Sequence, residues 1–134
     1  MQSFLNIIDL ETGRQIRAAE LGYYAERPSF CEGGSIRFYR DGKPMLMSLE
    51  SGAIQPDGGS RLITAPDSPL VRLGFLSEPV ERVAYVELIF DDGESSRVLA
   101  RFMGGEGSLG ENPISPDRKK LVFFGYPSED GINL

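Results

Sequence analysis

The chain has 134 residues, 40% of them hydrophobic and 25% charged, which is the composition of an ordinary globular domain. Its 20 acidic side chains outnumber 14 basic ones, and the net charge of −6 repels nucleic-acid backbones and anionic lipid surfaces. Its 16 glycines and 9 prolines favour many turns over long helices. We therefore expect one β-rich domain over residues 1–134, with neither nucleic acid nor a membrane as partner.

The single cysteine, Cys31, excludes an intrachain disulfide and a multi-cysteine metal site. The chain has no histidine, which removes the usual nucleophile-activating base and the commonest metal ligand. We predict a protein that is not an enzyme and holds no metal or cofactor. A carboxylate-dependent hydrolase is the enzymatic alternative, because two correctly spaced carboxyl groups suffice for glycoside hydrolysis. Its candidate carboxylates are Glu50, Glu87, Asp91, Asp92 and Glu94.

The first residues, 1–9, lack the basic start and the long apolar run of a secretion signal. No stretch approaches the ~18 consecutive apolar residues of a membrane span. We expect a soluble chain that is cytoplasmic when synthesised. Its cysteine content is also compatible with a virion or another large assembly.

Residues 4–10 and 15–18 are predicted to be strands joined by a turn. A helix over 12–22 is the alternative, because Thr12 and Gln15 have the spacing of a capping box. The hairpin is the favoured interpretation. Further along, 23–30 is expected to be an aromatic connection broken by a proline.

A second hairpin is predicted around Asp41-Gly42, a pair typical of tight turns. The strand before it, 35–40, should place Ile36 and Phe38 on one face and alternate with Arg37 and Tyr39 on the other. Its return strand is 45–49.

Residues 51–69 are expected to be mainly loop, with a short strand at 61–64, and 70–76 is another strand candidate. Ser77 and Pro79 then have the pattern of a helix start, so a helix over 78–88 competes with a strand. We favour the strand, because 85–90 is rich in β-formers and leads into an Asp-Gly turn.

The third predicted hairpin joins strands 83–90 and 97–102 through the acidic turn 91–94. That turn lacks the alternating acidic positions of a calcium loop, so a structural role is favoured over cation binding. Alternation along both strands predicts six residues that face the core: Val86, Leu88, Phe90, Val98, Ala100 and Phe102.

A flexible glycine- and proline-rich loop is predicted at 104–117. Residues 105–110 match the dinucleotide-binding pattern, but the prolines that follow prevent a helix, and Glu106 and Glu111 would repel phosphates. We interpret the match as chance. The apolar run 121–126 predicts a strand buried on both faces.

The densest aromatic segment contains two tyrosines, a phenylalanine and an arginine, which are residue types that protein interfaces favour. Together with the glycine-rich loop it is the predicted partner-binding surface. The alternative is that these rings cap one end of the core. The predicted partner-binding residues are Tyr23, Tyr24, Arg27, Phe30, Gly105, Glu106 and Leu109.

The predicted fold is all-β, an antiparallel β-sandwich or partly open barrel of about seven to nine short strands with at most one short helix. The predicted function is a non-catalytic protein-interaction or assembly module, such as an adaptor, an inhibitor or a structural subunit. Its partner would be another protein or a second copy of this chain. The binding alternative is a carbohydrate- or small-ligand-binding β domain that stacks its ligand on Tyr23, Tyr24 or Phe30.

Overall fold

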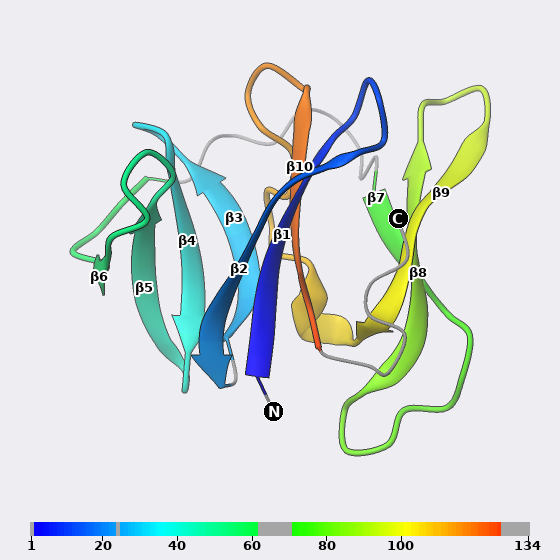
Figure 1. Cartoon of the computed structure of the whole chain (residues 1–134), viewed down its shortest axis with the longest axis horizontal. Coiled ribbons are helices and arrows are strands. Elements are labelled where there is room, and N and C mark those ends of the chain that lie inside the picture. The colour runs from blue at the N-terminus through cyan, green and yellow to red at the C-terminus, as the bar shows by residue number, and fades with distance from the viewer. Residues whose placement is uncertain (1, 24, 62–70, 127–134) are drawn as a thin grey trace.

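The computed structural model describes residues 2–23, 25–61 and 71–126, with the side chains of 2, 16–20 and 23 left out (Figure 1). This part of the chain is all-β, with ten antiparallel strands and a single short 3-10 helix, η1 (Glu106–Ser108). The predicted fold class is therefore confirmed. The strands are β1 (Gln2–Asp9), β2 (Gln15–Tyr23), β3 (Ala25–Cys31), β4 (Ser35–Arg40), β5 (Lys43–Ser48), β6 (Ile54–Pro56), β7 (Val71–Phe75), β8 (Ala84–Asp91), β9 (Ser96–Gly104) and β10 (Lys120–Gly125).

The strands form three small sheets in the orders β10-β1-β2, β3-β4-β5-β6 and β7-β8-β9, and none of these closes into a barrel. Figure 1 shows the β10-β1-β2 sheet standing between the other two. Most neighbours in a sheet are consecutive in the chain, so hairpins account for nearly all pairings. The exception is β10, which returns to pair with β1.

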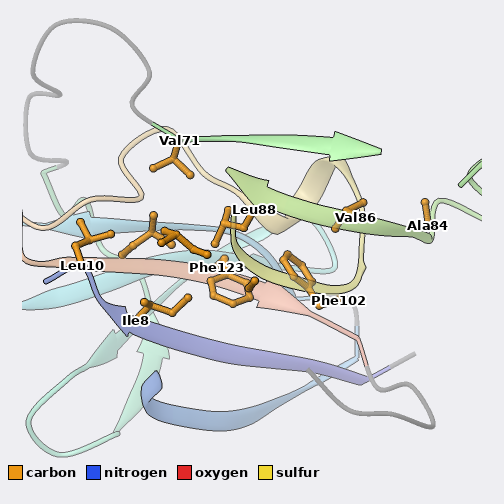
Figure 2. Packing of buried hydrophobic residues seen from close by; sticks show 11 residues of the cluster. Ile8, Leu10, Val71, Ala84, Val86, Leu88, Phe102 and Phe123 are labelled. Carbon is orange, nitrogen blue, oxygen red and sulfur yellow. The ribbon is translucent and has the colours of Figure 1, made fainter. Parts of the chain in front are cut away.

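The first core lies between the β10-β1-β2 sheet and the β7-β8-β9 sheet. Figure 2 shows Phe123 of β10 lying among Ile8, Leu88 and Phe102, and the Phe102 and Phe123 ring centroids are 4.7 Å apart. Ring pairs at this separation add to the stabilisation that burial gives. This core also includes Val86, which the alternation along 83–90 predicts to be buried.

The second core lies on the other face of β10 and β1. Phe124 of β10 meets Phe38 of β4 edge to face, with centroids 5.8 Å apart, and Leu5 and Ile36 pack beside them. Residues 121–125 are all buried, and their side chains contribute alternately to the two cores. The predicted burial of this strand on both faces is confirmed.

The segment 104–117, here called the strap, runs from β9 to β10 and ties the sheets together. The Phe30 amide donates to the carbonyl of Asn112 (2.9 Å), and the Val122 amide donates to the carbonyl of Pro113 (2.8 Å). The strap is therefore hydrogen-bonded to both β3 and β10, and these bonds fix its position along the two strands. Its predicted flexibility concerns motion and stays a prediction.

The predicted hairpin at Asp41-Gly42 is confirmed. Arg40 pairs with Lys43, and the two turn residues have φ of 52° and 77°, which is the conformation of a type I′ turn. The 12–22 helix is wrong and the favoured strand is right, because β2 pairs with β1 over this stretch. The predicted connection over 23–30 is also wrong from residue 25 onward, since β3 passes through Pro28 by way of a bulge.

The prediction that Val98 faces the core is wrong. Leu88 pairs with Ala100 but Ile89 pairs with Val98, so Leu99 is an extra residue, and this bulge turns its side chain inward instead. Leu99 is 6% exposed and Val98 is 42% exposed. The other predicted core positions are buried, except that Phe90 is partly buried against the first core.

The helix over 78–88 is wrong and the favoured strand is right. Val80 and Val83 exchange two backbone hydrogen bonds around Glu81 and Arg82, which close a tight turn before β8 begins. The structure also has a short strand, β6, in a region that we expected to be loop. The strand predicted at 61–64 falls largely outside the described residues.

Candidate functional site

The predicted site residues are distributed over several environments. Phe30 is 3% exposed and packs in the second core, which is the alternative considered for these rings. The Tyr23 side chain and all of Tyr24 lie outside the described part of the structure. Arg27 is exposed, and Leu109 is partly buried against the first core. Of the predicted residues, Arg27 and Leu109 line the same hollow.

The other two predicted residues flank η1. Gly105 is buried, and a Cβ at this position would clash with the carbonyl oxygen of Arg82. Its amide donates to the Ser108 hydroxyl at 3.0 Å. Glu106 is exposed in the first turn of η1. Since η1 is one short turn, the dinucleotide-like pattern here opens no helix that could hold a pyrophosphate.

The hollow that Arg27 and Leu109 share has a volume of about 260 Å³ and is here called the arginine hollow. Its walls come from β3, from β4 and from the strap. It contains two cationic side chains, two hydroxyl groups and one carboxylate. The lining residues are Arg27, Ser29, Arg37, Tyr39, Leu109, Gly110 and Glu111.

A bulge in β3 positions Arg27. The pairing of β3 with β4 shifts register between Glu26 and Ser29, and Arg27 has φ of 56°, in the left-handed region that residues with a side chain rarely adopt. Pro28 suits such a bulge, because it has no amide to give to the sheet. The bulge therefore holds an arginine in a strained conformation at the rim of a hollow, an arrangement common at functional sites.

The outward face of β4 supplies the second arginine. Arg37 pairs with Ser29 of β3, and its guanidinium carbon lies 6.0 Å from the centre of the Tyr39 ring. Both side chains point away from the core because Ile36 and Phe38, which alternate with them, are fully buried. The alternation predicted for 35–40 thus places Arg37 and Tyr39 side by side.

Asp57 is the counter-ion of Arg37, at 3.9 Å between Oδ2 and the nearer guanidinium nitrogen. Burial alone would raise the pKa of Asp57, but hydrogen bonds from Ser60 and from the Gly59 amide, together with Arg37, lower it below its ordinary value. Three donors already occupy the carboxylate at 2.7, 2.7 and 3.1 Å. The Arg37 guanidinium has five N–H donors, and its distance of 3.9 Å from Asp57 is longer than a hydrogen bond, so it keeps donors for a ligand.

The strap closes the third side of the hollow. A Cβ at Gly110 would clash with the Ser29 hydroxyl and the Pro28 carbonyl, so only glycine lets the strap lie this close to β3. The Asn112 amide donates to the Ser29 hydroxyl at 3.2 Å, which anchors the strap beside the hollow. Close packing at Gly110 therefore places its neighbours, Leu109 and Glu111, at the edge of the arginine hollow.

A second feature lies at the tip of the β7–β8 hairpin, where apolar side chains are exposed. Phe75 is 45%, Leu76 49% and Val80 71% exposed. We call these three residues the hairpin tip. Grouped exposure of this kind is typical of interaction surfaces, whereas single exposed apolar residues are ordinary. Figure 1 places this end of the hairpin at the same end of the molecule as η1.

Three of the five candidate hydrolytic carboxylates accept hydrogen bonds from neighbouring groups, whereas Glu50 and Glu94 are exposed. Glu87 accepts a hydrogen bond from Arg101 at 2.9 Å, and Asp92 accepts from the Glu94 and Ser95 amides, also at 2.9 Å. Asp91 accepts from the Gly93 amide at 3.0 Å. Within 2–23, 25–61 and 71–126, no three metal-ligating side chains come together as a metal site. The absence of enzymatic activity stays a prediction.

Sequence reasoning missed the role of Ser29, Arg37 and Tyr39, although it placed the last two outward. No local signal marks them, because their meeting with Leu109 depends on how the strap crosses β3. The hairpin tip was also missed, since its residues have an ordinary strand composition. Both features depend on contacts between distant parts of the chain.

The architecture is that of an all-β protein with three packed antiparallel sheets and a small cationic hollow at the edge of one of them. Comparison with protein-family models, with curated proteins and with solved structures finds no match to this chain. The described part also contains no helix long and apolar enough to cross a membrane.

Proposed function

We propose that this protein is a non-catalytic protein-interaction module whose arginine hollow receives an acidic group of its partner. The observation that carries the proposal is the convergence of Arg27 and Arg37 on one hollow. Arginine presents several donors in a planar fork that matches the two oxygens of a carboxylate. The acidic group would be an Asp or Glu side chain or the C-terminal carboxylate of a chain.

The size of the hollow supports a side chain rather than a whole small molecule as its occupant. Its volume of about 260 Å³ lies below the range of about 300–1,000 Å³ that is usual for small-molecule pockets. Arg and Tyr are also the residue types enriched at the energetic centres of protein interfaces. Arg27, Arg37 and Tyr39 fit that description.

The charges of the protein predict that binding of the partner depends on the salt concentration. The chain carries a net charge of −6, so an anionic partner is repelled at long range and attracted only near the two arginines. Glu111 lines the same hollow and repels a carboxylate that approaches from its side. The interaction should weaken as ionic strength rises, because partly exposed ion pairs are screened over about 8–10 Å.

A specific protein interface buries about 800 Å² on each partner, which is more than one small hollow supplies. The exposed apolar side chains of the hairpin tip could complete it. Gly105 of the strap touches the backbone of Arg82 in the hairpin, and Gly110 of the strap touches β3 beside Arg27. The strap therefore contacts both the turn of the β7–β8 hairpin and the β3 bulge beside the arginine hollow.

Selection from a peptide array tests this function. The array contains random peptides with a free C-terminus and the same peptides amidated, so that an internal acid and a terminal carboxylate are distinguished. We expect enrichment of one of these two acidic groups. Arg37→Gln should weaken the selected interaction about tenfold, which is the effect of losing one charge-assisted contact. Arg72→Gln is the matched control, because Arg72 is exposed on β7 and outside the hollow.

Two results would overturn the proposal. One is enrichment of peptides with no acidic group that bind Arg37→Gln as well as the wild type. The other is a single-stranded oligonucleotide that binds more tightly than any peptide, since this would make the hollow a phosphate site for nucleic acid.

A further inference from the structure

A larger hollow, of about 560 Å³, lies at the other end of β3 and shares no lining residue with the arginine hollow. It opens between the β3–β4 turn on one side and the end of the strap on the other. We call it the Cys31 hollow. The lining residues are Phe30, Cys31, Glu32, Gly33, Gly34, Leu49, Ser115, Pro116, Asp117 and Lys120.

Part of the lining of this hollow is apolar. Phe30 and Cys31 are buried, and Leu49 packs against the second core. Gly33 and Gly34, with φ of 88° and 75°, form the turn above them. A Cβ at either glycine would meet no atom within 4 Å, so the turn leaves open space rather than filling the hollow. An apolar group of a ligand could therefore contact this part of the lining without displacing protein atoms.

Two carboxylates and one ammonium group lie around the hollow. Asp117 accepts hydrogen bonds at Oδ1 from the Ser115 hydroxyl (2.5 Å) and the Lys119 amide (2.9 Å). These bonds, with smaller contributions from Lys120 and Lys119, lower the pKa of Asp117, so the carboxylate is ionised at neutral pH. Its Oδ2 atom accepts none of these bonds. Glu32 is exposed on the opposite turn and Lys120 is exposed beside Asp117.

We infer that the Cys31 hollow binds a small molecule with an apolar body and a protonated amine. Its volume falls within the range of about 300–1,000 Å³ that is usual for small-molecule sites. The apolar body would cover Leu49 and Pro116, and the ammonium group would pair with Glu32, because Asp117 already interacts with Lys119 and Lys120. The protein's net charge of −6 raises the local concentration of cations and favours this sign of ligand.

Three probes with the same chain and different head groups test the inference: hexylamine, hexanol and hexanoate. Each is titrated into the ¹⁵N-labelled full chain and followed by the amide signals of Gly33 and Gly34. We expect saturable shifts with hexylamine, and nuclear Overhauser contacts from its chain to the Leu49 methyl groups. Hexanol should bind about tenfold more weakly, because it lacks the charge-assisted contacts.

One substitution tests the contact between the amine and Glu32. Glu32→Gln should weaken hexylamine binding about tenfold and leave hexanol unchanged. Glu78→Gln is the matched control, since Glu78 is exposed near the hairpin tip and outside the hollow. The melting temperature of each variant shows that it is folded.

The inference is overturned if hexylamine shifts neither glycine signal at millimolar concentration, or if hexanol and hexanoate bind as tightly as hexylamine. It does not depend on the proposed function. Hexanoate reports on the arginine hollow through the Gly110 amide in the same experiment, so failure of one site is visible separately from failure of the other.

Discussion

Arg27 has two properties that oppose each other. Its φ of 56° is unfavourable for any residue with a Cβ, yet its guanidinium lines the arginine hollow. Glycine at this position would remove the strain and also the charge. A residue kept in an unfavourable conformation at a binding site is the pattern expected where binding and stability compete.

We therefore predict that Arg27→Gly stabilises the protein by about 0.5–1 kcal/mol, because relief of the left-handed strain exceeds the entropic cost of glycine. The same change should weaken peptide binding at the arginine hollow. Urea unfolding measures the first effect and the peptide array measures the second. Arg118→Gly is the control: Arg118 has φ of 62° and is exposed outside the hollow, so it should gain stability and keep binding. Loss of stability in both variants would contradict the argument from strain.

Two residues of the candidate site, Arg27 and Leu109, could be predicted at the level of single residues, because they lie in segments with an unusual density of aromatic residues or glycines. Their role in binding stays a prediction. Phe30 has the same local context but faces the core, and nothing within its segment indicates which face of β3 is inward. The bulge beside Pro28 decides this, because an extra residue reverses the alternation of side chains along the strand.

At the scale of the elements, the β7–β8 hairpin has a strained turn. Glu81 and Arg82 occupy its two central positions with φ of 52° and 69°, where Asn and Gly are the preferred residues. The turn at Asp41-Gly42 has the same backbone form and a more suitable sequence. The carbonyl of Arg82 lies against Gly105, so the strap supports the strained turn from one side.

Replacing the two turn residues by the favoured pair, Glu81→Asn with Arg82→Gly, should stabilise the protein by about 1–2 kcal/mol. The backbone carbonyl of Arg82 lies against the strap and its side chain is exposed, so the hairpin should keep its place. Thermal unfolding gives the change in stability. Asp41→Asn is a suitable comparison, because that turn already has glycine at its second position, and it should change stability by a few tenths of a kcal/mol at most. A double variant no more stable than the wild type would show that the turn is not strained.

Hairpins were the elements that sequence predicted best, and competing local signals explain the errors. Ser77 and Pro79 have the pattern of a helix start, but the Ser77 hydroxyl accepts a hydrogen bond from the Tyr85 amide at 2.9 Å and helps to close the hairpin. The same oxygen can cap a helix or a turn, so its identity alone does not decide between them. The bulge at Leu99 could not be predicted from the sequence of β9 alone, because a bulge is defined by the pairing of β9 with β8.

At the scale of the whole molecule, β10 belongs to both cores. Phe123 contributes to one and Phe124 to the other, and the strap reaches β10 from the β3 side through Pro113. If either outer sheet separates from the central sheet, one face of β10 becomes exposed to solvent. We therefore expect the described strands to unfold as one cooperative unit, although they form three separate sheets.

Val86→Ala tests this cooperativity, because Val86 is fully buried in the first core and makes no contribution to the second. We predict a loss of about 2 kcal/mol in the free energy of unfolding, from the removed methyl groups and the cavity they leave. Hydrogen exchange should show the same loss of protection in β8 and in β4, across the molecule, because both open only with β10. Val98→Ala is the control on the same hairpin, since Val98 is exposed by the bulge and should lower protection in neither strand. If Val86→Ala lowers protection in β8 alone, the two cores open independently and β10 does not couple them.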